Sequence, residues 1–230
     1  MYSKCKIANS PIRESASHRS EMVSEILYNE QFEILESQSN YWHKVRCTHD
    51  DYIGWIFSRQ LELTEELNFE IIARYTGEIQ KDFADQHLPV KFGIGSPINI
   101  NAGPKFQSLT DIAQQYLGTP YLWGGRSISG IDCSGLTQMC MLIAGKTFFP
   151  RDAWQQELEG EIVSSFDLTC NGDLIFFAEN EKITHVGMFH NGNIIHAAEQ
   201  VRIDKIINNQ IFNYDLQTTT LPIHSIKRYL

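Results

Sequence analysis

Residues Tyr121–Gly135 read YLWGGRSISGIDCSG, and this stretch decides how the rest of the chain is interpreted. Its glycines allow backbone to come close to a ligand, and Asp132 stands where a helix N-cap is expected. Apolar side chains then recur at spacings of four and three, which predicts a helix with Cys133 in its first turn. A helix N-terminus carries partial positive charge, so we expect the pKa of the Cys133 thiol to fall below about 8.5. The alternative is a buried structural cysteine.

A second stretch, Ile183–Ala198, reads ITHVGMFHNGNIIHAA and predicts a β-hairpin around Asn191-Gly192. With a two-residue turn there, the strand register places His185 and His196 on the same face of the hairpin, as diagonal neighbours. Gly187 falls opposite His196 and leaves that face open. A thiol, a histidine base and a second polar group to orient the base together indicate nucleophilic catalysis.

Six short stretches occur in the order found in a known family: YLWGG, DCSG, PRDAWQQ, GDLIFF, THVGM and IIHAA. Together they resemble the NlpC-type, papain-like cell-wall cysteine peptidases, over about the last 125 residues. The resemblance implies that Cys133 is the nucleophile, His185 the general base and His196 the orienting residue. It also implies an oxyanion hole with two donors, the backbone N–H of Cys133 and the side chain of Tyr121.

The same resemblance implies a substrate. The family cleaves the γ-D-glutamyl bond to a diamino acid in peptidoglycan stem peptides, which leaves the glutamate α-carboxylate free beside the scissile amide. Arg151 is placed to bind that carboxylate. Ser134, Asp132 and Asp152 are further substrate-binding candidates, with Asp132 also expected to act as the N-cap of the cysteine helix. No cofactor is implied.

Residues 5–66 carry short segments at regular spacing, separated by turn residues, which predicts a small all-β barrel or sandwich. We expect strands at Cys5–Ala8, Ser24–Leu27, Gln31–Glu36, Tyr41–Cys47 and Tyr52–Phe57, with a turn at Asn9-Ser10-Pro11. The Trp42 strand and the stretch GWIFSRQL resemble a bacterial SH3-like domain.

In papain-like peptidases of this kind, the SH3-like domain packs beside the active cleft and closes one end. The resemblance therefore implies that Tyr52, together with Glu21, holds the free amine of a substrate, because a phenol and a carboxylate both accept hydrogen bonds from an ammonium. The alternative is a rim tyrosine and a solvated glutamate.

We divide the chain into an SH3-like domain at 1–66, a linker or degenerate second SH3-like unit at 67–104 and a peptidase domain at 105–230. Ser108 is an N-cap candidate for a helix that ends at Gly118-Thr119-Pro120. A short helix is expected at Ala153–Leu158, and Ser225–Leu230 is expected to close a sheet. Helices followed by antiparallel strands indicate an α+β fold: a papain-like domain of helices packed on an antiparallel sheet, preceded by a small all-β barrel.

The 230 residues carry a formal net charge of −9, which argues against nucleic acid and anionic membrane as partners. No apolar run is long enough to span a bilayer, and the N-terminal stretch has no secretory signal pattern. The five cysteines form no CxxC or zinc-spaced cluster, so we expect free thiols in a reducing cytoplasm and no metal.

The expected partner is a peptide derived from peptidoglycan, with a free N-terminal L-Ala if the SH3-like domain closes the cleft. That would make the enzyme part of muropeptide recycling. Two alternatives remain open: a module that binds wall fragments without turnover, and an amidase or acyl transferase on the same scaffold.

Overall fold

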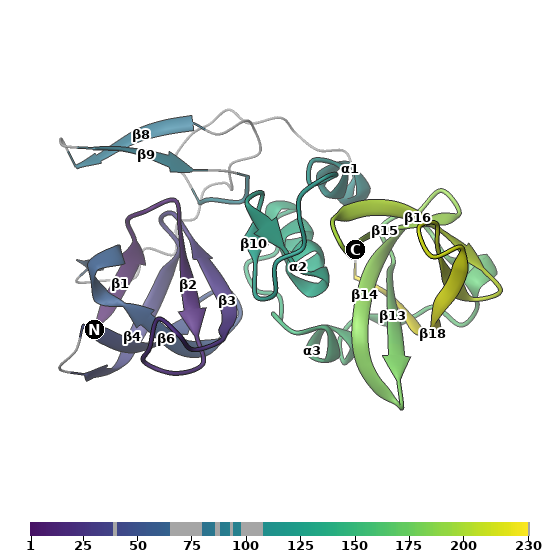
Figure 1. Cartoon of the computed structure of the whole chain (residues 1–230), viewed down its shortest axis with the longest axis horizontal. Coiled ribbons are helices and arrows are strands. Elements are labelled where there is room, and N and C mark those ends of the chain that lie inside the picture. The colour runs from purple at the N-terminus through teal and green to yellow at the C-terminus, as the bar shows by residue number, and fades with distance from the viewer. Residues whose placement is uncertain (39–40, 65–79, 86–87, 93, 98–107, 230) are drawn as a thin grey trace.

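The structure is a computed structural model that describes residues 1–38, 41–64, 80–85, 88–92, 94–97 and 108–229. Two β-rich domains lie at opposite ends of the molecule, and the helices lie between them (Figure 1). The purple and blue N-terminal domain contacts the teal helices, and the green and yellow strands form the far end (Figure 1).

The N-terminal domain is a curled antiparallel sheet of seven strands in the order β3-β2-β6-β5-β4-β1-β7. Its core is apolar and almost fully buried, because alternate residues of each strand face inward. The strands are β1 (Tyr2–Cys5), β2 (Asn9–Arg13), β3 (Met22–Leu27), β4 (Gln31–Gln38), β5 (Trp42–Cys47), β6 (Ile53–Phe57) and β7 (Leu61–Thr64), with a 3-10 turn at Ser58–Gln60.

The predicted strands from Ser24 to Phe57 agree closely with the structure, but the start of the domain does not. Asn9-Ser10-Pro11, expected to be a turn, belongs to β2. A proline is tolerated there because β2 pairs with β3 along its length and meets β6 only at Arg13. On the side of β2 that faces β6, Pro11 therefore needs no backbone N–H donor.

The region 67–104 lies largely outside the described residues, including the segment Leu67–Tyr75. The described part contains a two-stranded hairpin, β8 (Gln80–Asp85) with β9 (Leu88–Phe92). Whether this region is a linker or the remnant of a second SH3-like unit stays a prediction, as do the two boundaries between the three predicted segments.

The C-terminal domain begins with helices and continues as a closed sheet. Its main strands run in the order β12-β18-β13-β14-β15-β16-β17, and β18 also pairs with β17, which closes six of them into a barrel. The elements are α1 (Leu109–Gln114), β10 (Arg126–Ser127), β11 (Gly130–Ile131), α2 (Cys133–Ile143), α3 (Ala153–Glu157), β12 (Glu161–Ile162), a 3-10 turn (Phe166–Leu168), β13 (Leu174–Glu179), β14 (Lys182–His190), β15 (Asn193–Ala197), β16 (Val201–Ile207), β17 (Gln210–Asn213) and β18 (Thr218–Arg228).

The expected packing of helices on an antiparallel sheet is therefore only partly right. Helix α2 does pack on the sheet, because Leu136 and Met139 share one buried cluster with Val186 and Met188 of β14. The sheet, however, is a barrel with a second core of its own inside it. The sequence indicated a closing strand only at Ser225–Leu230, whereas β18 begins at Thr218 and is long enough to pair with two neighbours.

The two domains share buried surface. Leu27 of β3 belongs to the same buried cluster as α2. At Gly124, which has a φ of +78°, a Cβ atom would lie 2.6 Å from the carbonyl oxygen of Met22. Only glycine permits this conformation and this approach of the two backbones, so the glycine-rich loop is fitted against the N-terminal domain.

Candidate active site

Cys133 is the first residue of α2, as the sequence predicts. The Asp132 side chain caps the helix by accepting a hydrogen bond from the Gly135 N–H at 2.7 Å. Gly145, with a φ of +108°, follows the last turn. Cys133 is only 7% exposed, and the backbone N–H groups of Val186 and Ser134 lie near enough to its sulfur to lower the thiol pKa in part. The thiol thus lies against β14, beside the residue that follows His185.

The two histidines meet as the hairpin register predicts. His190 pairs with Asn193, and the ladder continues through Met188 and Ile195. His185 Nε2 lies 2.8 Å from His196 Nδ1, with the two rings nearly perpendicular. Cys133, His185 and His196 are therefore brought to one region, with His196 buried and His185 partly buried.

The predicted direction of the thiol pKa is wrong. Burial raises the pKa of Cys133 to about 12, and the nearby Asp132 carboxylate adds to the effect. The nearby backbone N–H groups of Val186 and Ser134 and the Arg151 charge act in the opposite direction but do not outweigh burial. Desolvation of a charged sulfur here costs more than the partial charge at a helix start supplies.

His185 is neutral at physiological pH. Burial lowers its pKa from 6.5 to about 3, and the neighbouring His196 contributes in the same direction. The raised thiol pKa and the lowered imidazole pKa both favour the uncharged forms of the two groups near neutral pH. The imidazole is available as a base throughout the neutral range.

The lowered pKa of His185 predicts a pH-dependent stability. The unfolded chain takes up this proton near pH 6.5 and the folded chain only near pH 3, so stability falls as the pH drops between those values. Between pH 7 and pH 5 the loss from this residue should reach about 2 kcal/mol at most. Urea unfolding of wild type and His185→Asn across this range checks it: the difference between the two curves should change with pH, and parallel curves would contradict it.

Arg151 does not have the role that the sequence suggested. All five of its N–H groups have acceptors within the protein. It binds both oxygens of Asp132, at 2.9 and 2.6 Å, and also Ser134 Oγ, the Gly125 carbonyl and Ser24 Oγ. No donor is left for a substrate carboxylate. Arg151 instead holds Asp132 and the start of α2 against β3 of the N-terminal domain.

This arrangement also occupies two other predicted binding residues. The Asp132 carboxylate accepts hydrogen bonds from the backbone of Gly124 and Gly135 in addition to those from Arg151. The Ser134 hydroxyl is buried and bonded to Asp132 and Arg151. Both residues shape the cysteine loop, and the N-cap role predicted for Asp132 is confirmed.

Tyr52, Asp152 and Tyr121 gather near the same place. Burial raises the pKa of Tyr52 to about 12, with the Asp152 charge adding to it and Arg151 opposing it. Burial also raises the pKa of Asp152. Tyr121 is 36% exposed, and its pKa is raised by burial and then by Cys133, so the phenol stays protonated close to the thiol.

Glu21 is not brought into this group by any contact of its side chain. It is exposed and lies one residue before β3. Among the described residues, its carboxylate forms no hydrogen bond or ion pair. Its neighbour Met22 touches the Gly124 loop, so Glu21 lies at the junction of the two domains.

Sequence reasoning missed Asp204, a residue of the site that is only 3% exposed. Its Oδ2 lies 3.1 Å from His196 Nε2 and 2.8 Å from Nε of Arg202. In the register of β15 and β16, His196 faces Arg202, and Asp204 is its diagonal neighbour. The turn between these strands, Ala198–Gln200, carries no strong hairpin signal, so this register could not be read in advance.

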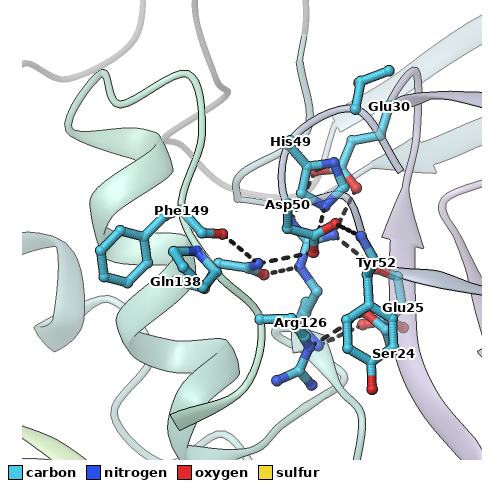
Figure 2. Close-up of polar contacts among 12 residues, drawn as sticks. Ser24, Glu25, Glu30, His49, Asp50, Tyr52, Arg126, Gln138 and Phe149 are labelled. Carbon is cyan, nitrogen blue, oxygen red and sulfur yellow. Dashed lines mark hydrogen bonds and ion pairs between the residues drawn. The ribbon is translucent and has the colours of Figure 1, made fainter. Parts of the chain in front are cut away.

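Sequence reasoning also missed a buried charge network at the junction of the domains (Figure 2). Arg126 of β10 pairs with both oxygens of Glu30, at 2.7 and 3.0 Å, and donates to the Glu25 carbonyl and to Gln138. Gln138 of α2 continues to Asp50, which lies 3.3 Å from His49. Polar residues scattered over both domains gave no local signal of this network.

Within the described ranges, no group of three or more His, Cys, Asp or Glu side chains is arranged to hold a metal ion. In that same part of the chain, no helix has the length and apolar character required to cross a bilayer.

Comparison with known proteins agrees with this architecture. Residues 118–220 match the NlpC/P60 family, and residues 12–61 match the bacterial dipeptidyl-peptidase Sh3 domain. The chain therefore contains an NlpC/P60 domain preceded by a bacterial SH3 domain, and the first of these is a domain of a peptidase family.

Individual relatives bear this out. A γ-D-glutamyl-L-lysine dipeptidyl-peptidase of Bacillus cereus is 38% identical over 108 residues, which cover 45% of this chain and 32% of that protein. A protein of the same name from Bacillus subtilis is 29% identical over 173 residues, 61% of this chain and 58% of its own. The matched stretches thus cover less than two thirds of either relative.

A solved structure supports the fold. The crystal structure of an NlpC/P60 family protein from Bacillus cereus covers the whole of both chains with a TM-score of 0.78 at 18% identity. At that identity the likeness speaks for the fold alone.

Proposed function

We propose that the chain is a cysteine peptidase that hydrolyses the γ-D-glutamyl–diamino acid bond of peptidoglycan stem peptides. The observation that carries the proposal is the placement of three residues: the Cys133 thiol lies near the backbone of Val186, which follows His185, and His185 contacts His196 at 2.8 Å. The names of the relatives support the bond that is cleaved.

The chemistry follows from the neutral pair. The Cys133 sulfur attacks the carbonyl carbon while His185 takes the thiol proton. His185, now an imidazolium, gives that proton to the amine as the C–N bond breaks, which leaves a thioester. Water then attacks the thioester, again with His185 as the base, and the thiol is released.

The negative oxygen that develops in both steps needs donors. The backbone N–H of Cys133 lies at the start of α2, where N–H groups have no partner within the helix. The Tyr121 phenol remains protonated near the thiol and is the second donor in this proposal.

The junction of the domains offers acceptors for a free amine. Tyr52 of the SH3 domain lies near enough to Asp152, before α3, for the Asp152 charge to raise the Tyr52 pKa, and burial makes the Asp152 carboxylate harder to ionise. An ammonium group there would relieve that cost. Asp132 contributes negative charge nearby, although its own hydrogen bonds are made within the protein. The support for Glu21 in this role is only its place beside Met22.

A site of this kind selects peptides that begin with a free L-Ala, and we extend the proposal to the recycling of such peptides in the cytoplasm. All five cysteines are free thiols, which fits a reducing compartment.

Mass spectrometry of L-Ala-γ-D-Glu-diamino acid incubated with the enzyme tests the proposal. Wild type should release a dipeptide and the free diamino acid, Cys133→Ala should release neither, and Cys170→Ala should match wild type because Cys170 is an exposed thiol outside the site. Identical products from wild type and Cys133→Ala would defeat the assignment. An N-acetylated tripeptide tests the claim that the enzyme binds a free N-terminal amine. Cleavage of this peptide at the same rate as the free peptide would rule out the amine site.

A further inference from the structure

The contact between His185 and His196 continues to a buried carboxylate. Asp204 accepts a hydrogen bond from His196 Nε2 at 3.1 Å and another from Arg202 Nε at 2.8 Å. Burial acts against its charge, but the bonds from His196 and Arg202 hold the pKa of Asp204 below its ordinary value. Asp204 is therefore an ionised group behind the second histidine.

The hydrogen-bond donors and acceptors along Asp204, His196 and His185 can be assigned by starting at the Asp204 carboxylate. An ionised carboxylate only accepts, so Nε2 of His196 must carry a proton. In the tautomer whose proton is on Nε2 alone, Nδ1 of His196 is an acceptor, and His185 then donates from Nε2 across the 2.8 Å contact. Because His185 is neutral, its remaining nitrogen, Nδ1, has a free lone pair.

We propose that Asp204 is a positioning residue of the reaction, which acts through His196 to keep the proton of His185 on Nε2 and the base on Nδ1. The inference rests on the proposed function. The carboxylate also favours the imidazolium that forms when His185 takes the thiol proton, because it stabilises positive charge along the pair. Asp204 itself touches no reacting atom.

The chain provides a matched control on the same arginine. Arg202 also binds Asp215 at 2.7 Å, and Asp215 is 74% exposed. Replacing Asp204 or Asp215 with asparagine removes one negative charge from Arg202 in each case. Of these two aspartates, only Asp204 contacts His196 in the described structure, so the two variants separate an effect on the histidine from an effect on the arginine.

Kinetics of the tripeptide reaction test the role. Asp204→Asn should lower kcat about 10- to 100-fold with KM within about twofold, as expected for a group behind a catalytic ligand or base. Asp204→Glu should restore part of kcat, and Asp215→Asn should stay within about twofold of wild type. An Asp204→Asn enzyme with the kcat of Asp215→Asn would overturn the proposal.

A second measurement does not depend on activity. Imidazole ¹⁵N NMR of wild type should show His185 and His196 as Nε2–H tautomers, and Asp204→Asn should show a mixture while Asp215→Asn does not. A wild-type His185 protonated on Nδ1 would overturn the inference, even if no variant folds. If wild type fails to cleave the tripeptide, the proposed function fails, and the NMR result still decides the tautomers.

Discussion

Replacing Arg126 with methionine is expected to lower the free energy of unfolding by about 3–5 kcal/mol, because carboxylates that stay buried lose their counter-charge. Arg126 is fully buried, and Glu25 and Glu30 are 4% and 1% exposed. The guanidinium neutralises Glu30 through two contacts and also donates to the Glu25 carbonyl, as Figure 2 shows in part. Methionine keeps much of the volume and none of the charge.

Urea unfolding measures the effect, and the exposed pair Arg46–Glu33 supplies the control. That pair is 3.5 Å apart with both side chains well exposed, so Arg46→Met should cost less than about 1 kcal/mol. An equal loss of unfolding free energy at the two positions would show that the buried network stabilises the protein no more than an exposed ion pair does. Tyr52 belongs to the N-terminal domain, which Arg126 holds against the C-terminal domain through Glu25 and Glu30. We therefore also expect Arg126→Met to raise KM for the free tripeptide.

Replacing Gly187 with alanine is expected to lower kcat by about 100-fold or more, because it displaces the histidine pair. A Cβ at Gly187 would lie 2.5 Å from Ile194 Cδ1 and 2.9 Å from His196 Cβ, closer than such atoms normally approach. Both neighbours are buried, so they have little room to yield. His196 must shift, and the 2.8 Å contact with His185 is lost or lengthened.

Gly192→Ala is the matched control for this change. It is the same substitution on the same hairpin, at a φ of +81° with no atom within 4 Å of the added Cβ. It strains the turn and should lower the melting temperature, but it should leave kcat near that of wild type. If both variants lose kcat in proportion to their loss of stability, crowding at His196 is not the cause.

The parts of the site that the sequence predicts correctly are those set by short-range rules. Asn191-Gly192 determines a hairpin register, so the meeting of His185 and His196 could be counted out residue by residue. An aspartate before an apolar helical pattern likewise placed Cys133 at a helix start.

The parts that it misses or misreads depend on burial and on contacts between distant segments. The sequence predicts the wrong direction for the thiol pKa, because the burial that raises it cannot be read from a helix cap. The sequence predicts Arg151 as a free cation, because its acceptors, Ser24 among them, lie up to 127 residues away in the chain. The sequence does not predict Asp204, because the turn before β16 carries no strong hairpin signal that would set the strand register.

The charge network between the domains limits how this architecture can be rearranged during evolution. Arg126 and Gln138 come from one domain, whereas Glu25, Glu30 and Asp50 come from the other. A recombination event that exchanged either half for an unrelated counterpart would leave the buried charges of the other half without partners and without access to water. The two halves are therefore expected to be inherited as a unit, even though each matches a family model of its own.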